Sequence, residues 1–352
     1  IKSTVGAKFK SYIIEDELPN GISISKIFDR VISEMVAYFD STGELDHSPV
    51  EVALEGSGDP ATPLRFPGKV LADEAGGRLF IADSNHHRIV IADLTTYQVL
   101  DVIGAGQAGL EDGDFETARF NTPQGIALDG DRLYVADTYN HAIRAIDLST
   151  QTVTTIAGTG VRGDFGFPGG EPIPDAPTSI DLRSPWDVEL GEDGLLYIAM
   201  AGTHQILTLN LEADWLDVVV GSGREALVND TLLASGLAQP SGLYFDEGLL
   251  YFADSESSSI RVADFTTGVV RTLAGPLENT LFDFGDVDGP VGISRIQHPL
   301  DVTGTPEGLR VSGLDVRGGR RLVTIGLDGS VGSDYLGPVV APATYGGFGH
   351  LA

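Results

Sequence analysis

The chain contains no cysteine, and it contains no lysine after Lys69. The lack of thiols excludes disulfide bonds, a cysteine nucleophile and thiolate metal ligands. Positive charge is scarce as well: 22 Lys and Arg stand against 51 Asp and Glu, a formal net charge of −29. Such a surface repels phosphate backbones and acidic lipids, so nucleic acid is not an expected partner. We interpret the acidity as an adaptation to solubility or salt, and a basic or cationic partner is the alternative.

Long apolar runs are also missing. No stretch of about 18 apolar residues occurs, so no transmembrane segment is expected in this chain. The first residue is Ile rather than Met, which we interpret as the result of losing a signal peptide or an upstream domain. A processed N-terminus favours an extracytoplasmic location, periplasmic or secreted, over a cytoplasmic one but leaves the compartment open.

Glycine, in contrast, is abundant, with 45 residues, and the sequence repeats itself. Each copy contains four apolar stretches that are continuous rather than alternating, as in strands buried on both faces. Four-stranded sheets stacked around an axis meet that requirement, so we predict an all-β fold, a β-propeller; a solenoid is the runner-up. The copies begin at Phe66, Thr122, Ser184, Gln239 and His298, each with proline at its second position.

These copies predict five blades, of which the fifth is degenerate because it lacks the Ala-Asp pair that ends the second strand elsewhere. We expect a sixth blade, composite or partial, built from both ends of the propeller. The predicted organisation is an N-terminal extension over 1–60, a propeller over 61–335 and a tail over 336–352 that is a candidate for closing the ring. The extension would hold a strand and one amphipathic helix at about 25–39, docked on the main domain.

The stretch LYVADTYNHAIRAIDL, with the block Asp137–Ile143 at its centre, resembles the NHL repeat. Together with the long loop Gly104–Gly125, it resembles the propeller of proteins that join a thioredoxin-like domain to NHL repeats. The thioredoxin-like domain is not present in this chain, and without cysteine no redox pair can be transferred to it. The resemblance implies that the motif's Asp accepts hydrogen bonds in a turn and that its His packs between blades. The corresponding turn residues here are Asp83, Asp137, Asn140 and Asp254.

Three histidines lie at equivalent positions in consecutive copies, four residues after the end of the second strand. They are His87, His141 and His204, and Ser258 takes this position in the fourth copy. Imidazole is a common ligand of zinc and other transition metals. If these side chains met near the propeller axis, they would form the metal site of a hydrolase or lyase. The alternative, which we favour, is a structural role repeated once per blade.

Two acidic loops are candidate calcium sites, because calcium takes six to eight oxygen ligands. Their alternative role is that of ordinary Asp- and Gly-rich connections. The carboxylates concerned are Glu111, Asp112 and Asp114 in one loop, and Asp283, Asp286 and Asp288 in the other. The triplets of the form Gly-x-Gly recur at strand ends and are not followed by a helix, so they indicate blade connections rather than a nucleotide site.

The sequence therefore predicts a non-catalytic interaction scaffold or an accessory subunit whose partner is another protein or the subunits of a complex. No cofactor is expected, with calcium and zinc as the alternatives named above. A metal-dependent hydrolase or lyase is the alternative function, and a remnant of a thioredoxin-linked redox adaptor is the second. The long, proline-rich loop Gly163–Pro177 is the first place to look for recognition.

Overall fold

A computed structural model describes residues 64–335, except 165, 193, 278–279, 282, 306–307, 315–319 and 327–330. The predicted helix at 25–39, the predicted N-terminal strand and the tail over 336–352 lie outside the described residues, as does the composite sixth blade that they would build. Among the described residues, no helix has the length and apolarity needed to span a bilayer.

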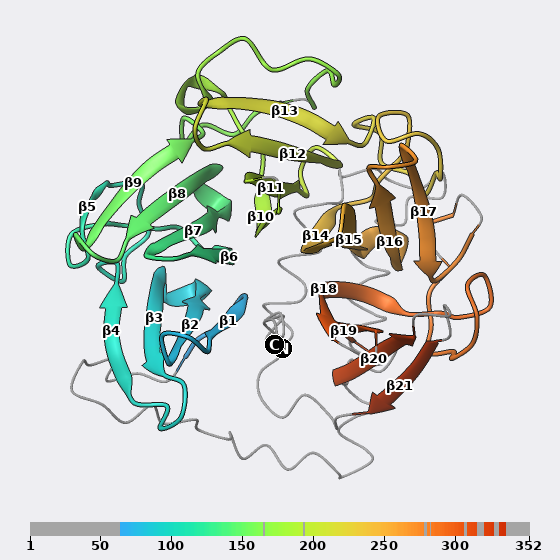
Figure 1. The fold of residues 1–352 in the computed structure, drawn as a ribbon, viewed down its shortest axis with the longest axis horizontal. Helices are drawn as coiled ribbons and strands as arrows, with labels where there is room; N and C mark the ends of the chain where they lie inside the picture. Colours follow the sequence, from blue (N-terminus) through green and yellow to red (C-terminus); the bar gives the residue numbers. More distant parts are fainter. Residues whose placement is uncertain are drawn as a thin grey trace, which may run out of the picture. The chain divides into compact units, whose positions relative to one another are not determined.

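Five antiparallel sheets follow one another around an axis, each formed by consecutive strands of the chain (Figure 1). The first comprises β1 (Val70–Asp73), β2 (Arg78–Asp83), β3 (Arg88–Asp93) and β4 (Val99–Ile103). The second comprises β6 (Pro123–Asp129), β7 (Arg132–Asp137), β8 (Ala142–Asp147) and β9 (Thr152–Ala157), with the short β5 (Gly113–Asp114) added at the edge of β9.

The remaining three sheets repeat this order. The third contains β10 (Pro185–Leu190), β11 (Leu195–Met200), β12 (Gln205–Asn210) and β13 (Trp215–Val220). The fourth contains β14 (Pro240–Asp246), β15 (Leu249–Asp254), β16 (Ser259–Asp264) and β17 (Val269–Ala274). The fifth contains β18 (Gln297–Thr305), β19 (Gly308–Leu314), β20 (Arg320–Gly326) and β21 (Val331–Tyr335). The all-β propeller with five four-stranded blades is thus confirmed, including the degenerate fifth copy.

The core lies between neighbouring blades rather than within each one. One buried cluster joins Phe80 and Ile91 of the first blade to Leu133 of the second, and another joins Ile143 of the second blade to Leu196 of the third. Equivalent clusters join the third blade to the fourth and the fourth to the fifth. This packing explains why the strands are continuously apolar: both faces of the second, third and fourth sheets contact a neighbour.

A tight kink lies at or just before the start of the innermost strand of every blade. The residue before each proline has a left-handed backbone with φ between 41° and 58°; these residues are Phe66, Thr122, Ser184, Gln239 and His298. In the last four blades the pairing of the inner strand is interrupted near this proline, as between Pro123 and Ile126. The interruption separates the start of the inner strand from its neighbour. In the third and fifth blades the pairing resumes at a charged residue, Asp187 and Asp301 respectively.

Short 3-10 turns join the second and third strands of three blades. They are η1 (Ser84–His86), η2 (Thr138–Asn140) and η4 (Ser255–Ser257), and a further one, η3 (Pro177–Ser179), lies in the connection between the second and third blades.

Candidate functional site

The buried aspartate at the end of the second strand organises the turn that follows it. Asp137 is completely buried, and its Oδ1 accepts the backbone N–H of Asn121 at 2.7 Å. Its Oδ2 accepts the Asn140 side-chain amide at 2.8 Å and Arg144 Nη1 at 3.0 Å. Three donors around one carboxylate compensate for its removal from water.

The same arrangement recurs with different side chains in two other blades. Asp254 accepts hydrogen bonds from Ser257 at 2.8 Å and from Arg261 at 3.0 Å. Asp83 accepts hydrogen bonds from Arg88 Nε at 2.8 Å, and His86 Nδ1 lies 2.8 Å from it. The aspartates and Asn140 thus form their side-chain hydrogen bonds within their own blades and to the connections that lead into them.

Two of the arginines that complete this motif were missed by sequence reasoning. Arg144 and Arg261 are fully buried, and each also donates to carbonyl groups of the preceding long connection: Arg144 to Arg119 and Glu111, and Arg261 to Gly236 and Val228. The arginine thus fastens the connection to the sheet. The signal was present in the sequence, since an arginine inside an apolar strand, seven residues after a buried aspartate, requires a partner.

The third blade lacks this ion pair. Met200 and Leu207 occupy the positions of the aspartate and the arginine, and both are fully buried. Its connection is held instead by Gln205, whose amide accepts the N–H of Phe167 at 2.9 Å and donates to the Phe167 carbonyl at 2.8 Å. The proline-rich loop is therefore attached to the third blade through Gln205.

The three histidines connect successive blades. Each has a left-handed backbone, and each accepts at Nδ1 the N–H of the kinked residue before the next proline: Thr122 to His87 at 3.1 Å, Ser184 to His141 at 3.0 Å and Gln239 to His204 at 3.2 Å. In each ring Nδ1 thus forms a hydrogen bond between two blades, and the pair of blades differs from one histidine to the next. The structure does not bring the three rings to a common point, and the described residues contain no group of three side chains with suitable metal-ligating atoms.

The protonation state of these rings follows from the same bonds. A ring that accepts at Nδ1 is neutral and carries its proton on Nε2. Burial lowers the pKa of His87, His141 and His204, which favours the neutral ring.

The first acidic loop is tied to the scaffold through its carboxylates. Asp112 Oδ1 accepts Arg144 Nη2 and the Thr155 hydroxyl, both at 2.8 Å. Asp114 Oδ1 accepts the N–H and the hydroxyl of Thr117, and Glu111 lies 3.6 Å from Arg119.

The second acidic loop also forms an ion pair with the scaffold. Asp283 forms an ion pair with Arg295 at 2.6 Å, whereas Asp286 and Asp288 reach the surface.

A charged cluster near the axis joins the inner strands. Lys69 Nζ lies 3.0 Å from both carboxylate oxygens of Asp187 and 3.5 Å from Glu189 Oε2. Lys69 belongs to the first blade and Asp187 to the third, so the ion pair bridges blades that are not neighbours in sequence. Asp187 also accepts the N–H of Leu243, in the fourth blade, at 2.9 Å. Asp301, on β18, completes this axial cluster, which we define as Lys69, Asp187, Glu189 and Asp301.

Equivalent positions of the repeat build this cluster. Two residues after each proline the five blades have Lys69, Gly125, Asp187, Gly242 and Asp301 in turn. A Cβ atom on Gly125 would clash with Asp187, and one on Gly242 would clash with Asp301. Glycine therefore alternates with aspartate because each aspartate fills the space beside the preceding blade. Sequence reasoning missed the cluster, although this alternation was visible in the copies.

The electrostatics of the cluster are dominated by burial. Burial alone would lower the pKa of Lys69, but the carboxylates of Asp187, Glu189 and Asp301 outweigh it and hold that pKa above its ordinary value. Burial raises the pKa of Glu189 to about 7 and that of Asp301 well above the usual range. The ammonium is therefore charged and fully engaged, and it acts as a counter-ion rather than as a nucleophile.

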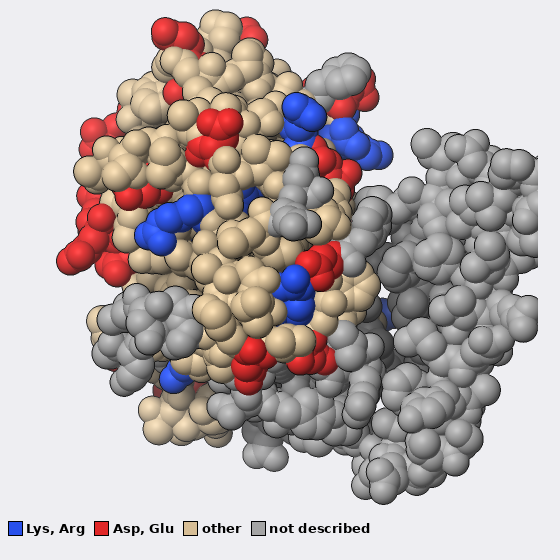
Figure 2. Space-filling view, turned by 90° about the vertical axis from the view of Figure 1, so that its right-hand side faces the viewer, with Lys and Arg blue, Asp and Glu red and all other residues tan. Residues whose placement is uncertain are grey.

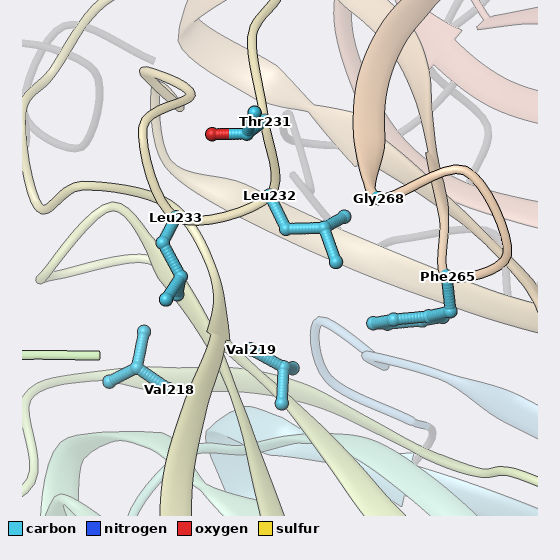
Figure 3. Close-up of a pocket in the computed structure, with 7 residues that line it drawn as sticks. All are labelled: Val218, Val219, Thr231, Leu232, Leu233, Phe265 and Gly268. Atoms are coloured by element: carbon cyan, nitrogen blue, oxygen red, sulfur yellow. The ribbon is translucent and has the colours of Figure 1, made fainter. Parts of the chain in front are cut away.

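An apolar groove lies on the outside, between the third and fourth blades (Figure 3). Its volume is about 350 Å³. The residues that line it include Val218 of β13, Leu232 and Leu233 of the connection, and Phe265 of the turn between β16 and β17. Thr231 supplies a hydroxyl at its edge, and no ionisable side chain lines it. The groove could hold an apolar group, but its lining offers no ionisable side chain that could act as an acid or base.

The surface is acidic where it can be seen. Figure 2 shows the side of the molecule on which β17 and β21 lie in Figure 1, with Asp and Glu side chains spread over it among fewer Lys and Arg. This matches the excess of carboxylates in the whole chain.

Comparison with known proteins relates this architecture to a repeat family. A family model described as NHL repeat matches residues 120–146. NHL repeat-containing protein 2 of Gallus gallus is 41% identical over 295 residues, which cover 76% of this chain and 39% of that protein. Protein SUPPRESSOR OF QUENCHING 1, chloroplastic, of Arabidopsis thaliana is 40% identical over 304 residues, which cover 81% of this chain and 28% of that protein.

The chain thus spans about two fifths or less of the length of these curated relatives. A chain in a solved nidogen/laminin complex has a similar fold, with a TM-score of 0.52 at 15% identity, over 78% of this chain and 81% of that one. At that identity the likeness concerns the fold alone.

Proposed function

The chain is an NHL-repeat β-propeller, and we propose that it acts as a non-catalytic interaction scaffold or as an accessory subunit of a larger protein assembly. The proposal rests chiefly on the use of the repeated polar residues: each histidine of the motif is bonded to the backbone of the next blade. A side chain that forms the same hydrogen bond to the next blade in successive repeats has the role expected of a structural residue.

The remaining candidates for chemistry support the same proposal. The buried aspartates are bonded to neighbouring side chains and backbone groups, and Lys69 is held as a counter-ion between carboxylates. A catalytic acid or base must instead be able to reach a substrate. The exposed connections also differ from blade to blade, and recognition by a rigid scaffold usually resides in such connections.

The hydrolase or lyase alternative would require the three histidines to share a metal, whereas each lies at a different pair of blades. No contact in the described residues favours the redox-adaptor alternative. We therefore favour the scaffold proposal over both alternatives.

The test is to isolate the full-length protein from its source under gentle conditions and to weigh the particle by native mass spectrometry. Stoichiometric additional protein chains, cross-linked to exposed connections of the propeller, are the expected result. A particle that contains a single chain and a bound zinc or calcium ion would contradict the proposal and revive the metal-dependent enzyme.

To separate the two functions further, the histidine variant His141→Ser is compared with the wild type. Ser258 already occupies the equivalent position in the fourth blade, so serine suits this backbone. We expect the variant to keep its partner chains, whereas a metal enzyme would lose its metal.

A further inference from the structure

The described part of the connection between the fourth and fifth blades, residues 275–277, 280–281 and 283–296, is a platform held by backbone hydrogen bonds. Val287 and Arg295 exchange two backbone hydrogen bonds, of 3.0 and 2.8 Å, and Gly289 exchanges two with Val331 of β21, of 3.1 and 3.2 Å. The N–H of Gly292 donates to the carbonyl of Gly275 at 3.0 Å. Because its backbone is already fixed, this connection would lose little conformational freedom when it binds a partner.

Two positions of this platform differ from all the other connections. Six residues before the proline of the next blade, the others have Thr117, Ser179 and Ala234, whereas this one has Ile293. At the second glycine of the Gly-x-Gly triplet, the others have Gly106, Gly160 and Gly223, whereas this one has Leu277. The same scaffold is built elsewhere with small or polar residues, so the two apolar side chains are not needed for the blade.

Both side chains are exposed to solvent. Ile293 is 61% exposed, Leu277 is 53% exposed and nearby Val287 is 45% exposed. Leu277 lies against Gly292, and Ile293 against Gly289, so that both border the same turn of chain. We name Leu277, Val287 and Ile293 the connector patch. Large apolar side chains gathered on an ordered surface commonly mark an interaction site.

The charge around the connector patch restricts what can cover it. Asp286 and Asp288 are exposed on either side of Val287 and add to the negative charge around the patch. The side of the molecule shown in Figure 2 carries further carboxylates. An occupant must therefore combine apolar residues with positive charge, and acidic lipid headgroups are repelled.

We propose that the connector patch binds a basic amphipathic segment of a partner protein. Its apolar residues would cover Leu277, Val287 and Ile293, and its Lys or Arg side chains would face Asp286 and Asp288. The assignment deepens the scaffold function proposed above and rests on it.

The test uses a synthetic helical peptide of leucine and lysine, labelled for fluorescence anisotropy, and a second peptide in which glutamate replaces every lysine. The full-length protein is compared with the variant Leu277→Gly/Ile293→Thr, which restores residues that other blades use at these positions. We expect the basic peptide to bind the wild type roughly tenfold more tightly than this variant, because the variant loses most of the buried apolar area. We expect the acidic peptide not to bind.

Matched control variants separate the patch from general stickiness and charge. Val161→Thr removes another exposed apolar side chain, 59% exposed, from a different connection and should leave binding unchanged. Asp286→Asn/Asp288→Asn should weaken binding and reduce its dependence on salt, whereas Glu171→Gln/Asp175→Asn, two exposed carboxylates elsewhere, should change it less. Unchanged urea midpoints would establish that all variants are folded.

Several results would overturn the assignment. These are no binding of the basic peptide, equal binding by the wild type and Leu277→Gly/Ile293→Thr, or equal loss in the control variants. Dimerisation of the wild type that this double variant abolishes would identify a second copy of the chain as the occupant instead. If natural partner chains co-purify equally well with the double variant, the scaffold function stands and only the assignment of this surface fails.

Discussion

Replacing Lys69 by methionine removes the positive charge of the axial cluster while keeping the apolar stem of the side chain. The ammonium is almost completely buried and lies 3.0 Å from both oxygens of Asp187, a group that is itself buried. Without it, Asp187 keeps the N–H of Leu243 but has no counter-ion. Breaking one side of a buried ion pair costs about 3–5 kcal/mol, so we expect Lys69→Met to reduce the free energy of unfolding by that amount.

The double variant Lys69→Met/Asp187→Asn removes both charges. The Asn side chain can still accept from Leu243, so we expect a free energy of unfolding within about 1–2 kcal/mol of the wild type. The coupling energy is the sum of the losses in the two single variants minus the loss in the double variant, so it should be at least about 1 kcal/mol even if Asp187→Asn alone costs nothing.

Urea unfolding, followed by far-UV circular dichroism and by the fluorescence of the adjacent Trp186, measures all four proteins of this cycle. Arg132→Gln is the control, because Arg132 and Asp147 form an exposed pair at 3.9 Å, which should contribute at most about 1 kcal/mol. The reasoning is refuted if Lys69→Met costs less than about 1 kcal/mol, or if the double variant is no more stable than Lys69→Met.

Three further predictions concern other buried polar groups. Arg144→Leu leaves Asp137 buried without its guanidinium and should lower the free energy of unfolding by about 3–5 kcal/mol in urea titrations; a loss under about 1 kcal/mol would contradict this. Because the pKa of Glu189 is raised to about 7, its protonated form stabilises the fold below the unfolded pKa of 4.5, and this stability, up to about 3 kcal/mol, is lost as the pH rises through 7. The free energy of unfolding of Glu189→Gln should therefore rise relative to that of the wild type between pH 5 and 8. A difference between the two proteins that stays constant over this range would contradict the prediction. Burial lowers the pKa of His141, so the stability that its neutral ring contributes is present above the unfolded pKa of 6.5 and is lost as the pH falls. His141→Ser loses the hydrogen bond from Ser184 and should lower the free energy of unfolding by about 1 kcal/mol at pH 8. The loss should be smaller at pH 5, as urea titrations at the two pH values would show.

The blade architecture could be predicted from the sequence because every copy must satisfy the same local demands. A proline after a kinked residue, continuous apolar strands and a turn aspartate recur in register, and each reports on contacts within one blade or with its neighbour. Even the fifth blade forms four strands without the Ala-Asp pair, because its apolar strands pack on Ile260 and Ala274 of the fourth. Apolar packing therefore outweighs the missing turn motif.

The axial cluster could not be predicted in the same way. Lys69 and Asp187 are 118 residues apart, on blades that are not adjacent in the chain, so no local period relates them. Their meeting depends on how many blades surround the axis and how closely the inner strands approach, which is a property of the assembled propeller. Only the alternation of glycine with charged residues after the prolines hints at it.

The histidines show where a repeated motif becomes ambiguous. Their equal spacing correctly indicates equal placement in each blade, but a ring at that position could face the axis or the neighbouring blade. Sequence periodicity does not distinguish these directions, because both place one histidine per blade. The left-handed backbone of His141 and the bond from Ser184 decide it in the structure.

Differences between repeats carry the information that the repeats themselves cannot. Where Met200 and Leu207 replace the ion pair, Gln205 takes over the attachment of the proline-rich loop, so the change is compensated within the blade. Where Leu277 and Ile293 replace glycine and small or polar residues, the new apolar side chains stay 53% and 61% exposed. A compensated difference is explained by the fold, whereas an uncompensated one requires an explanation outside it. That contrast points to the connection between the fourth and fifth blades, rather than the proline-rich loop, as the first surface on which to seek a partner.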